Sequence, residues 1–216
     1  MEYRKEIDGL RALAVLPVML FHAGFETFSG GYVGVDVFFV ISGYLITSIL
    51  LKSLQEDRFS LGEFYERRIR RILPALFVVL LASFPFAWLW MLPADMNRYS
   101  ASLASVPLFA SNVLFWRSSG YFDASSELKP LLHTWSLAVE EQFYLLYPLL
   151  LALAWPRGRR AVVALLVLGA VASFAMAEWN APLRPSFTFY LLPTRAWELA
   201  LGALAALWLS RPHPGP

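Results

Sequence analysis

The sequence predicts an all-α protein, a polytopic transmembrane helical bundle of about six spans with one cytoplasmic amphipathic helix and one re-entrant or interfacial segment. Of the 216 residues, 58% are hydrophobic, with 17 Phe, 9 Tyr and 8 Trp, which is too apolar for a soluble domain. Several apolar runs approach the roughly 20 residues that cross a bilayer. We therefore expect one transmembrane domain over residues 1–216, with the lipid bilayer as its first partner.

The charged residues exclude several classes of function. The formal net charge is only +2, and 15 of the 18 basic residues are arginines gathered in a few clusters. Such clusters are typical of membrane topology, and they leave no soluble basic surface for a nucleic acid. The chain has no cysteine, which rules out disulfides and thiolate metal sites, and we predict no metal ion.

The first apolar helix, 7–24, carries Arg11 at its entrance and His22 near its exit. Eleven residues put them about 20° apart around the helix and about 16 Å apart along it, roughly half the hydrocarbon thickness. A cation and a titratable base on one stripe of the helix favour a site in which the two groups contact different parts of one extended substrate. Two other interpretations stay open: the histidine hydrogen-bonds a neighbouring helix, and the arginine snorkels. We also expect Asp8 to cap this helix and Pro17 to kink it.

Asp36, Gly43 and Thr47 form a small polar stripe on the second predicted span, 35–54. Their spacing of seven and four residues places them on one helix face, where small residues allow close packing. Asp36 is expected near the depth where His22 ends. Its carboxylate is a candidate to orient the imidazole and stabilise its protonated form, or to cap the helix, and the two roles are compatible.

The segment 59–74 predicts an amphipathic helix with a strong start, because Ser60 and Glu63 fit a capping box. Three of its arginines lie on the polar side, where lipid headgroups are available partners: Arg67, Arg70 and Arg71. Arg68 instead projects from the middle of the apolar face. It therefore needs an anionic partner inside the bundle, for which a phosphate is a good geometric match.

The third span is predicted at 73–92, and the serine-rich segment 100–116 that follows is short for a full crossing. If that segment crossed, the arginine-rich turn at 155–160 would fall outside. If it is re-entrant or interfacial, the turn falls inside with the other basic clusters. We expect the second arrangement, with a cytoplasmic N-terminus.

Three further spans are predicted at 135–155, 161–177 and 187–209. Two adjacent glutamates, Glu140 and Glu141, enter the first of these helices and need partners, which solvent at the outer interface is able to supply. Arg195 and Glu198 in the last helix stand three residues apart. We expect these two to neutralise one another in a structural pair.

Five stretches of the chain carry a resemblance: IDGLRALAVLPVMLFH, GGYVGVDVFFVISGYLIT, FYERRIRRILPA, SGYFD with LLHTWSLAVEEQFYLLYP, and FYLLPTRAWELALG. Together they cover nearly the whole chain and resemble, in order, the membrane acyltransferase family three, the O-antigen and peptidoglycan O-acetylase type. Arg11 and His22 match that family's motif of an arginine, ten residues and a histidine. Arg68 and Arg71 fit its cytoplasmic element of two arginines separated by two residues.

The resemblance implies an O-acyltransferase of the bacterial inner membrane. It would move an acetyl group from cytoplasmic acetyl-CoA to a hydroxyl of an extracytoplasmic or membrane-linked glycan, such as peptidoglycan or lipopolysaccharide. Together with the residues it indicates that acetyl-CoA, the donor substrate, binds at four arginines: Arg11, Arg67, Arg68 and Arg71. His22 would deprotonate the acceptor or carry the acetyl group transiently, with Asp36 or Glu141 orienting its ring.

The family's membrane domain is longer, with several further helices after the segment that matches 187–209. We therefore expect a C-terminally truncated or minimal form, which further helices or a partner chain would complete. Two alternatives to catalysis arise from the same buried charges: a non-catalytic transport or translocation module, and an inactive fragment that needs a partner. No inverted repeat is visible in the sequence, which counts against transport.

Overall fold

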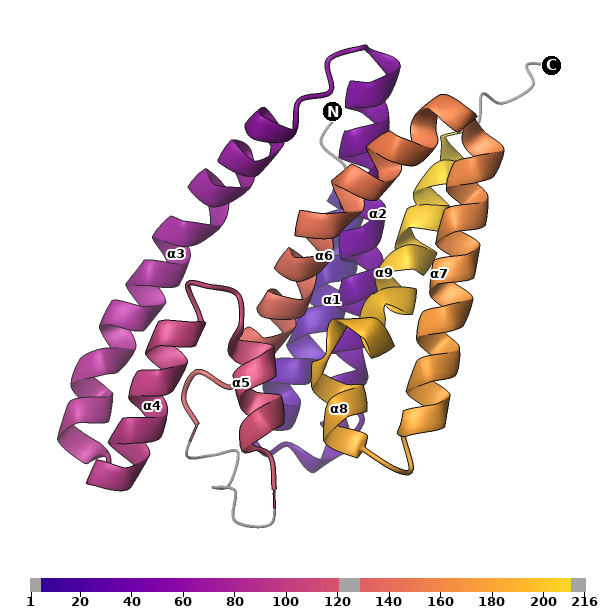
Figure 1. Cartoon of the computed structure of the whole chain (residues 1–216). Coiled ribbons are helices and arrows are strands. Elements are labelled where there is room, and N and C mark those ends of the chain that lie inside the picture. The colour runs from indigo at the N-terminus through magenta and orange to yellow at the C-terminus, as the bar shows by residue number, and fades with distance from the viewer. Residues whose placement is uncertain (1–4, 121–128, 211–216) are drawn as a thin grey trace. The chain divides into compact units, whose positions relative to one another are not determined.

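Helices form the part of the chain that the computed structural model describes, residues 5–120 and 129–210, and no strand is present there (Figure 1). The long helices are α1 (Lys5–His22), α2 (Gly34–Gln55), α3 (Leu61–Trp90), α6 (Thr134–Ala154), α7 (Arg159–Asn180) and α9 (Leu192–Leu209). Shorter helices lie between them: α4 (Pro93–Ser105), α5 (Ser111–Ser118) and α8 (Pro185–Tyr190). The all-α class is thereby confirmed for these ranges.

Within the described ranges, four segments are long and apolar enough to cross a membrane: Gly31–Gln55, Leu61–Trp90, Thr134–Arg157 and Arg159–Asn180. They correspond to the second to fifth predicted spans. The predicted last span is divided into α8 and α9, because Pro193 has no N–H and is accommodated in the first turn of a new helix. The total of six spans stays a prediction.

The described residues group into two compact units, and α6 contributes to both. Unit 1 contains α1, α2, most of α7, most of α9 and the second half of α6, within 1–59, 146–179 and 193–216. Unit 2 contains α3, α4, α5, α8 and the first half of α6, within 60–145 and 180–192. The single-domain organisation expected from the sequence stays a prediction.

Unit 1 packs through close helix contacts at glycines. A Cβ at Gly43 of α2 would collide with the carbonyl oxygen of Leu199 on α9, and a Cβ at Gly202 of α9 would collide with the backbone of α2. One turn beyond Gly43, the buried Thr47 donates a hydrogen bond of 2.9 Å to the hydroxyl of Tyr147. The close packing predicted for this stripe of α2 is confirmed at both positions.

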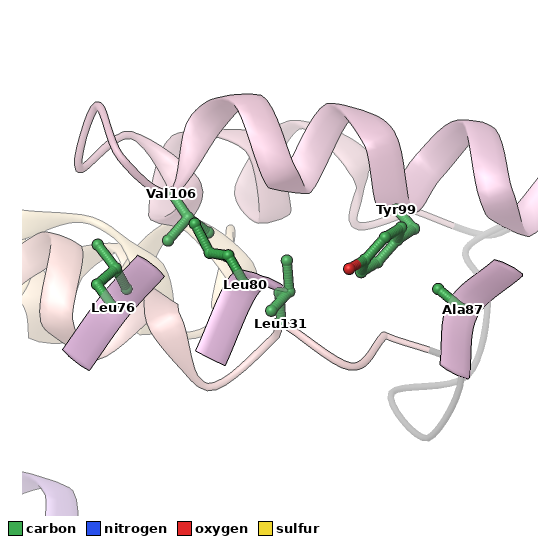
Figure 2. Close-up of a cluster of buried hydrophobic side chains, with 6 residues drawn as sticks. All are labelled: Leu76, Leu80, Ala87, Tyr99, Val106 and Leu131. Atoms are coloured by element: carbon green, nitrogen blue, oxygen red, sulfur yellow. The ribbon is translucent and has the colours of Figure 1, made fainter. Parts of the chain in front are cut away.

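Unit 2 is held together by a hydrophobic cluster around α3. Figure 2 shows its side chains, which come mainly from α3 and α4: Leu76, Leu80, Ala87, Tyr99, Val106 and Leu131. The hydroxyl of Tyr99 lies 2.8 Å from the Oγ of Ser83, so the polar tip of this buried ring is hydrogen-bonded. The cluster fixes α4 against the distal half of α3.

Helix α3 begins where the sequence predicts and extends further. Ser60 is its N-cap and accepts a hydrogen bond of 3.3 Å from the backbone N–H of Glu63, as the capping box predicts. The helix then continues unbroken to Trp90, so the separate amphipathic helix expected at 59–74 is wrong. Its 30 residues measure about 45 Å, against a hydrocarbon thickness of about 30 Å. The helix is thus longer than a perpendicular crossing requires, and the arginines lie in its first turns.

Two expected helix caps are wrong. Asp8 lies inside the first turn of α1, which begins at Lys5, and its charge there complements the helix dipole without capping. The N-cap of α2 is Val33, which makes no side-chain cap hydrogen bond, and Asp36 lies in the first turn of the helix. In both cases the preceding residues already adopt helical or turn geometry, so the helix starts earlier than the carboxylate.

The segment expected not to cross the membrane, 100–116, is divided between α4 and α5. The chain turns between them at Phe109, a residue with a positive φ of 50°. These helices have 13 and 8 residues, well short of the roughly 20 that cross a bilayer. No single helix crosses here, and a re-entrant or interfacial position stays a prediction.

Candidate functional site

Arg11 and His22 lie on one continuous helix, α1, although Pro17 stands between them. Their separation of eleven residues corresponds to about 16 Å of helical rise. Near Pro17, α1 comes close to the short 3-10 helix Gly31–Val33 that precedes α2, because a Cβ at Gly31 would collide with the Pro17 carbonyl oxygen. Because α1 is continuous, Arg11 and His22 keep the helical spacing that the sequence predicts.

His22 is the last residue of α1, and its own helix holds the imidazole. Nδ1 lies 2.8 Å from the carbonyl oxygen of Val18. Because a carbonyl oxygen only accepts, this hydrogen bond puts a proton on Nδ1 and leaves the lone pair of the neutral ring on Nε2. The ring of Phe21 meets the imidazole edge-on, with centroids 5.0 Å apart. Nε2 is thus the nitrogen with the chemistry of a base.

Arg11 is partly buried between α1 and α2. Its guanidinium lies 5.9 Å from the centroid of the Phe38 ring, a cation–π contact. Its Nε is buried, with no hydrogen-bond partner among the described residues. A guanidinium whose donors are not all used within the protein is suited to binding an anion.

A second charged group of unit 1 joins α2 and α9. Nη1 of Arg195 donates hydrogen bonds of 2.8 Å to the carboxylates of both Asp36 and Glu198. The predicted pairing of Arg195 with Glu198 is confirmed. The pairing with Asp36 was not predicted, because 159 residues separate these two positions and no local pattern connects them. The carboxylate expected to orient His22 is therefore engaged by an arginine.

The main charged group of unit 2 joins α3 and α6. Arg68 forms an ion pair with Glu141, and its guanidinium carbon lies 4.1 Å from the centroid of the Tyr144 ring. The Tyr144 hydroxyl donates a hydrogen bond to Glu140, so both adjacent glutamates have partners within this unit. The inward direction predicted for Arg68 is confirmed, and the anion that it meets in the protein is a carboxylate.

The other arginines at the start of α3 point away from this packed face. Arg67 pairs with Glu63 at 3.1 Å and Arg70 with Glu66 at 2.7 Å, each within one turn of the helix. The side chain of Arg67 is 63% exposed, against 18% for Arg68, and Arg71 is exposed as well. The division into one inward and three outward arginines agrees with the sequence pattern.

A cavity of about 270 Å³ lies beside Arg68 in unit 2. Its walls are mainly apolar, and Arg68, Glu141 and Gln142 are its charged or amide-bearing residues. The other lining residues are Tyr65, Ile69, Ile72, Leu108, Phe109, Tyr144 and Leu145. An apolar cavity with a few convergent polar groups is the usual composition of a ligand site.

A partly buried amide, Gln142, and a buried one, Asn112, hold one wall of this cavity. Nε2 of Gln142 donates hydrogen bonds to the carbonyl oxygen of Phe109 at 2.8 Å and to the Oδ1 of Asn112 at 2.9 Å. Asn112 donates in turn to the carbonyl oxygen of Tyr190 at 3.2 Å. These bonds brace the left-handed backbone at Phe109. This pairing was not predicted, because 30 residues separate Asn112 and Gln142 and no local pattern connects them.

Part of one motif from the sequence lies outside the described residues, namely 121–123 of SGYFD. The motif's continuation after position 129 forms the start of α6 and supplies the paired glutamates. Within 5–120 and 129–210 there is no group of three or more His, Asp or Glu side chains that would hold a metal ion.

A family model described as an acyltransferase domain matches residues 4–216. The chain belongs to this acyltransferase family. The match includes α1 with its Arg11–His22 pair and the arginine-rich start of α3, so the resemblance read from the sequence is confirmed. No solved structure matches the chain.

Several similar proteins have names that agree with this family. The peptidoglycan O-acetyltransferase OatA of Listeria monocytogenes is 38% identical over 96% of this chain and 34% of that protein. The putative peptidoglycan O-acetyltransferase YrhL of Bacillus subtilis is 39% identical over 95% of this chain and 33% of that protein. The putative membrane-bound transacylase BcsY of Komagataeibacter xylinus is 38% identical over 95% of this chain and 51% of that protein.

The chain spans about a third of the length of the first two relatives and about half of the third. With four apolar helices in the described ranges and a relative named as a putative membrane-bound transacylase, it is a multi-pass membrane protein of the acyltransferase family. The family match over residues 4–216 includes all the helices described above.

Proposed function

We propose that the protein transfers an acyl group, in the simplest case acetyl, from cytoplasmic acyl-CoA to a hydroxyl of an extracytoplasmic or membrane-linked glycan. The observation that carries this proposal is the family match over residues 4–216, which contains Arg11 and His22 on one helix. One relative is named a peptidoglycan O-acetyltransferase and a second a putative one, which supports a glycan hydroxyl as the acceptor.

The donor is proposed to bind at the arginines of α3. Guanidinium groups bind phosphates in a bidentate manner, and acetyl-CoA carries several phosphate charges. Arg67 and Arg71 are exposed in the first turns of α3, and Arg68 lines the neighbouring cavity. In this proposal the exposed arginines meet the phosphates, and the apolar cavity accommodates an uncharged part of the donor. Arg11 is a further candidate, because its Nε lacks a partner among the described residues.

His22 is proposed as the base. Its Nε2 would take the proton of the acceptor hydroxyl as the new ester bond forms, or would carry the acetyl group transiently. Asp36 belongs to the same unit and remains a candidate to orient the ring, with a carboxylate shared with Arg195. For Glu141, which is paired with Arg68, a role in orienting His22 stays a prediction.

The protein is proposed to lie in a bacterial inner membrane with its N-terminus in the cytoplasm. The basic start of α3 and the arginine-rich turn at 157–160 support this orientation, because basic loops remain on the cytoplasmic side. The named relatives are bacterial. Donor and acceptor would then approach from opposite compartments.

The test is acetyl transfer by the purified, membrane-reconstituted protein, with isotope-labelled acetyl-CoA and soluble peptidoglycan fragments. Replacing His22 by alanine should reduce transfer by at least about 10²-fold, since a general base contributes about that much. Membrane insertion and thermal stability should be unchanged, because the residue is exposed at the end of its helix. The control is Met19→Ala, an exposed residue of the same helix, which should transfer at the normal rate.

Transfer by His22→Ala at the rate of the Met19→Ala control would remove this histidine from the mechanism. If labelled product forms and neither substitution changes its rate, the protein is an acyltransferase that uses a base other than His22.

A further inference from the structure

Two carboxylates of unit 1 share a single guanidinium between α2 and α9. Asp36 and Glu198 both accept from Nη1 of Arg195, each at 2.8 Å. The exposed fractions of the three side chains are 35% for Asp36, 16% for Arg195 and 1% for Glu198. If all three were ionised, the group would carry a net charge of −1, and its most deeply buried member would be an anion.

The second oxygen of Glu198 is an orphan. Its Oε2 is buried and has no hydrogen-bond partner among the described residues. The charges that act on Glu198 are those of Arg195 on its own helix and Asp36 on α2. The α2–α9 contact is closed at Gly43 and Gly202, where no side chain fits between the backbones. An ionised oxygen without a donor in such a place is far more costly than a neutral one.

We propose that Glu198 is a proton-binding site, which holds a proton while Asp36 and Arg195 remain an ion pair, and which releases and regains that proton in each acyl transfer. The protonated acid accepts from Arg195 through Oε1 and carries its hydrogen on Oε2. The group of three is then electrically neutral, which lowers the free-energy cost of burying it. Asp36, the most exposed member, is the carboxylate that keeps its charge.

The role in the reaction rests on the proposed function and follows from its proton balance. An O–H bond of the acceptor and the C–S bond of the donor thioester break, while an ester C–O bond and an S–H bond form. One proton therefore leaves the acceptor hydroxyl, and one proton ends on the thiolate of the departing coenzyme. No oxidant, reductant or further reactant is needed.

With donor and acceptor on opposite sides, that proton has two routes. If it were released on the acceptor side and another were taken up on the donor side, each cycle would move one positive charge outward against the membrane potential. A protonatable carboxylate inside the helices provides a route through the protein that avoids this work. Glu198 is the described carboxylate whose second oxygen is buried without a partner.

The first test measures the proton directly and does not depend on transfer. Infrared spectra of the reconstituted protein in H₂O and D₂O should contain a carbonyl stretch of a protonated carboxylic acid that shifts on deuteration. This band should be absent in Glu198→Gln and present in Glu178→Gln, a control at an exposed glutamate of α7 in the same unit. Glu198→Gln should melt within a few degrees of the unmodified protein, because the amide reproduces the neutral acid.

The second test is transfer from labelled acetyl-CoA to peptidoglycan fragments across a sealed vesicle membrane. Glu198→Gln should lower kcat at least tenfold with an unchanged KM for acetyl-CoA, and Glu198→Asp, which keeps a protonatable group, should recover part of the rate. Glu178→Gln should transfer normally.

A missing band in the unmodified protein, or a large loss of stability in Glu198→Gln, would overturn the protonated state. A band together with normal transfer by Glu198→Gln would overturn the role in the reaction. If the unmodified protein transfers nothing, the proposed function fails and the role in the reaction fails with it, while the band still decides whether Glu198 holds the proton.

Discussion

Arg67 and Arg68 of α3 differ in how far their partner carboxylates are exposed to solvent. Arg68 is paired with Glu141, and the two side chains are 18% and 9% exposed, so each neutralises a charge that lies largely out of water. Arg67 and its partner Glu63 are 63% and 64% exposed, and solvent screens them. Buried pairs are costly to break because one charge remains uncompensated, whereas exposed pairs contribute little.

Arg68→Ala should therefore lower the free energy of unfolding by about 3–5 kcal/mol, against at most about 1 kcal/mol for Arg67→Ala. Adding Glu141→Gln to Arg68→Ala should recover most of the loss, because the stranded charge is removed. Denaturant unfolding in detergent micelles measures these differences. In the stabilised double variant the KM for acetyl-CoA should still be raised well above that of Arg67→Ala.

Equal losses of stability in Arg68→Ala and Arg67→Ala would show that breaking the buried Arg68 pair costs no more than breaking an exposed one. A normal KM in the double variant would limit Arg68 to a structural role.

The sequence predicted directions of side chains better than their partners. The wheel position of Arg68 was enough to predict that it points inward, because helical periodicity is local. Its partner Glu141 lies 73 residues away, and Asp36 lies 159 residues from Arg195. Pairs of that kind depend on how helices pack, which no spacing within one helix encodes. The pair of Arg195 and Glu198 was predictable because it stands within one turn.

At the scale of the helices, α2 and α9 depend on glycine at their crossing. The Leu199 carbonyl oxygen occupies the place where a Cβ of Gly43 would lie. Because both groups are backbone, neither moves without separating the helices. The same crossing carries the Asp36–Arg195–Glu198 group, so its geometry follows from the closeness of these two helices.

Gly43→Ala should destabilise the protein by about 1–3 kcal/mol, as overpacked sites do. The matched control is Gly169→Ala on α7, where a Cβ meets nothing within 4 Å and alanine favours the helix. Thermal unfolding in detergent should give a lower midpoint for the first variant and an unchanged or higher one for the second. If both midpoints were equal, the α2–α9 crossing would be looser than the structure describes.

Of the predicted helix caps, the capping box of α3 was right, whereas the single carboxylates Asp8 and Asp36 were not caps. Ser60 with Glu63 marked the start of α3 correctly, since a cap is a local hydrogen bond. Prolines were harder to interpret: Pro74 lies inside α3 without ending it, whereas Pro193 stands in the first turn of α9 after a break. Membrane helices tolerate interior proline because neighbouring groups satisfy the freed backbone, so the residue alone does not decide.

For the whole molecule, we propose that the donor and the acceptor approach from opposite sides of the membrane. Arginines gather in the first turns of α3, and His22, the proposed base, ends α1. Membership of the acyltransferase family supports the proposal that acyl transfer connects the two. The sequence predicted the helical membrane class and the family because hydrophobicity and motif spacing are written along the chain. It did not predict how the charged side chains pair across helices, which tertiary packing decides.

The central claim is that an acyl group from a donor on the arginine side reaches an acceptor on the other side. The most direct measurement uses sealed vesicles in which the orientation of the N-terminus has been determined. Labelled acetyl-CoA is supplied on one side and peptidoglycan fragments on the other. We predict labelled glycan only when acetyl-CoA is on the side of the N-terminus, and none with His22→Ala. Label that appears only when donor and acceptor share one side would contradict the account.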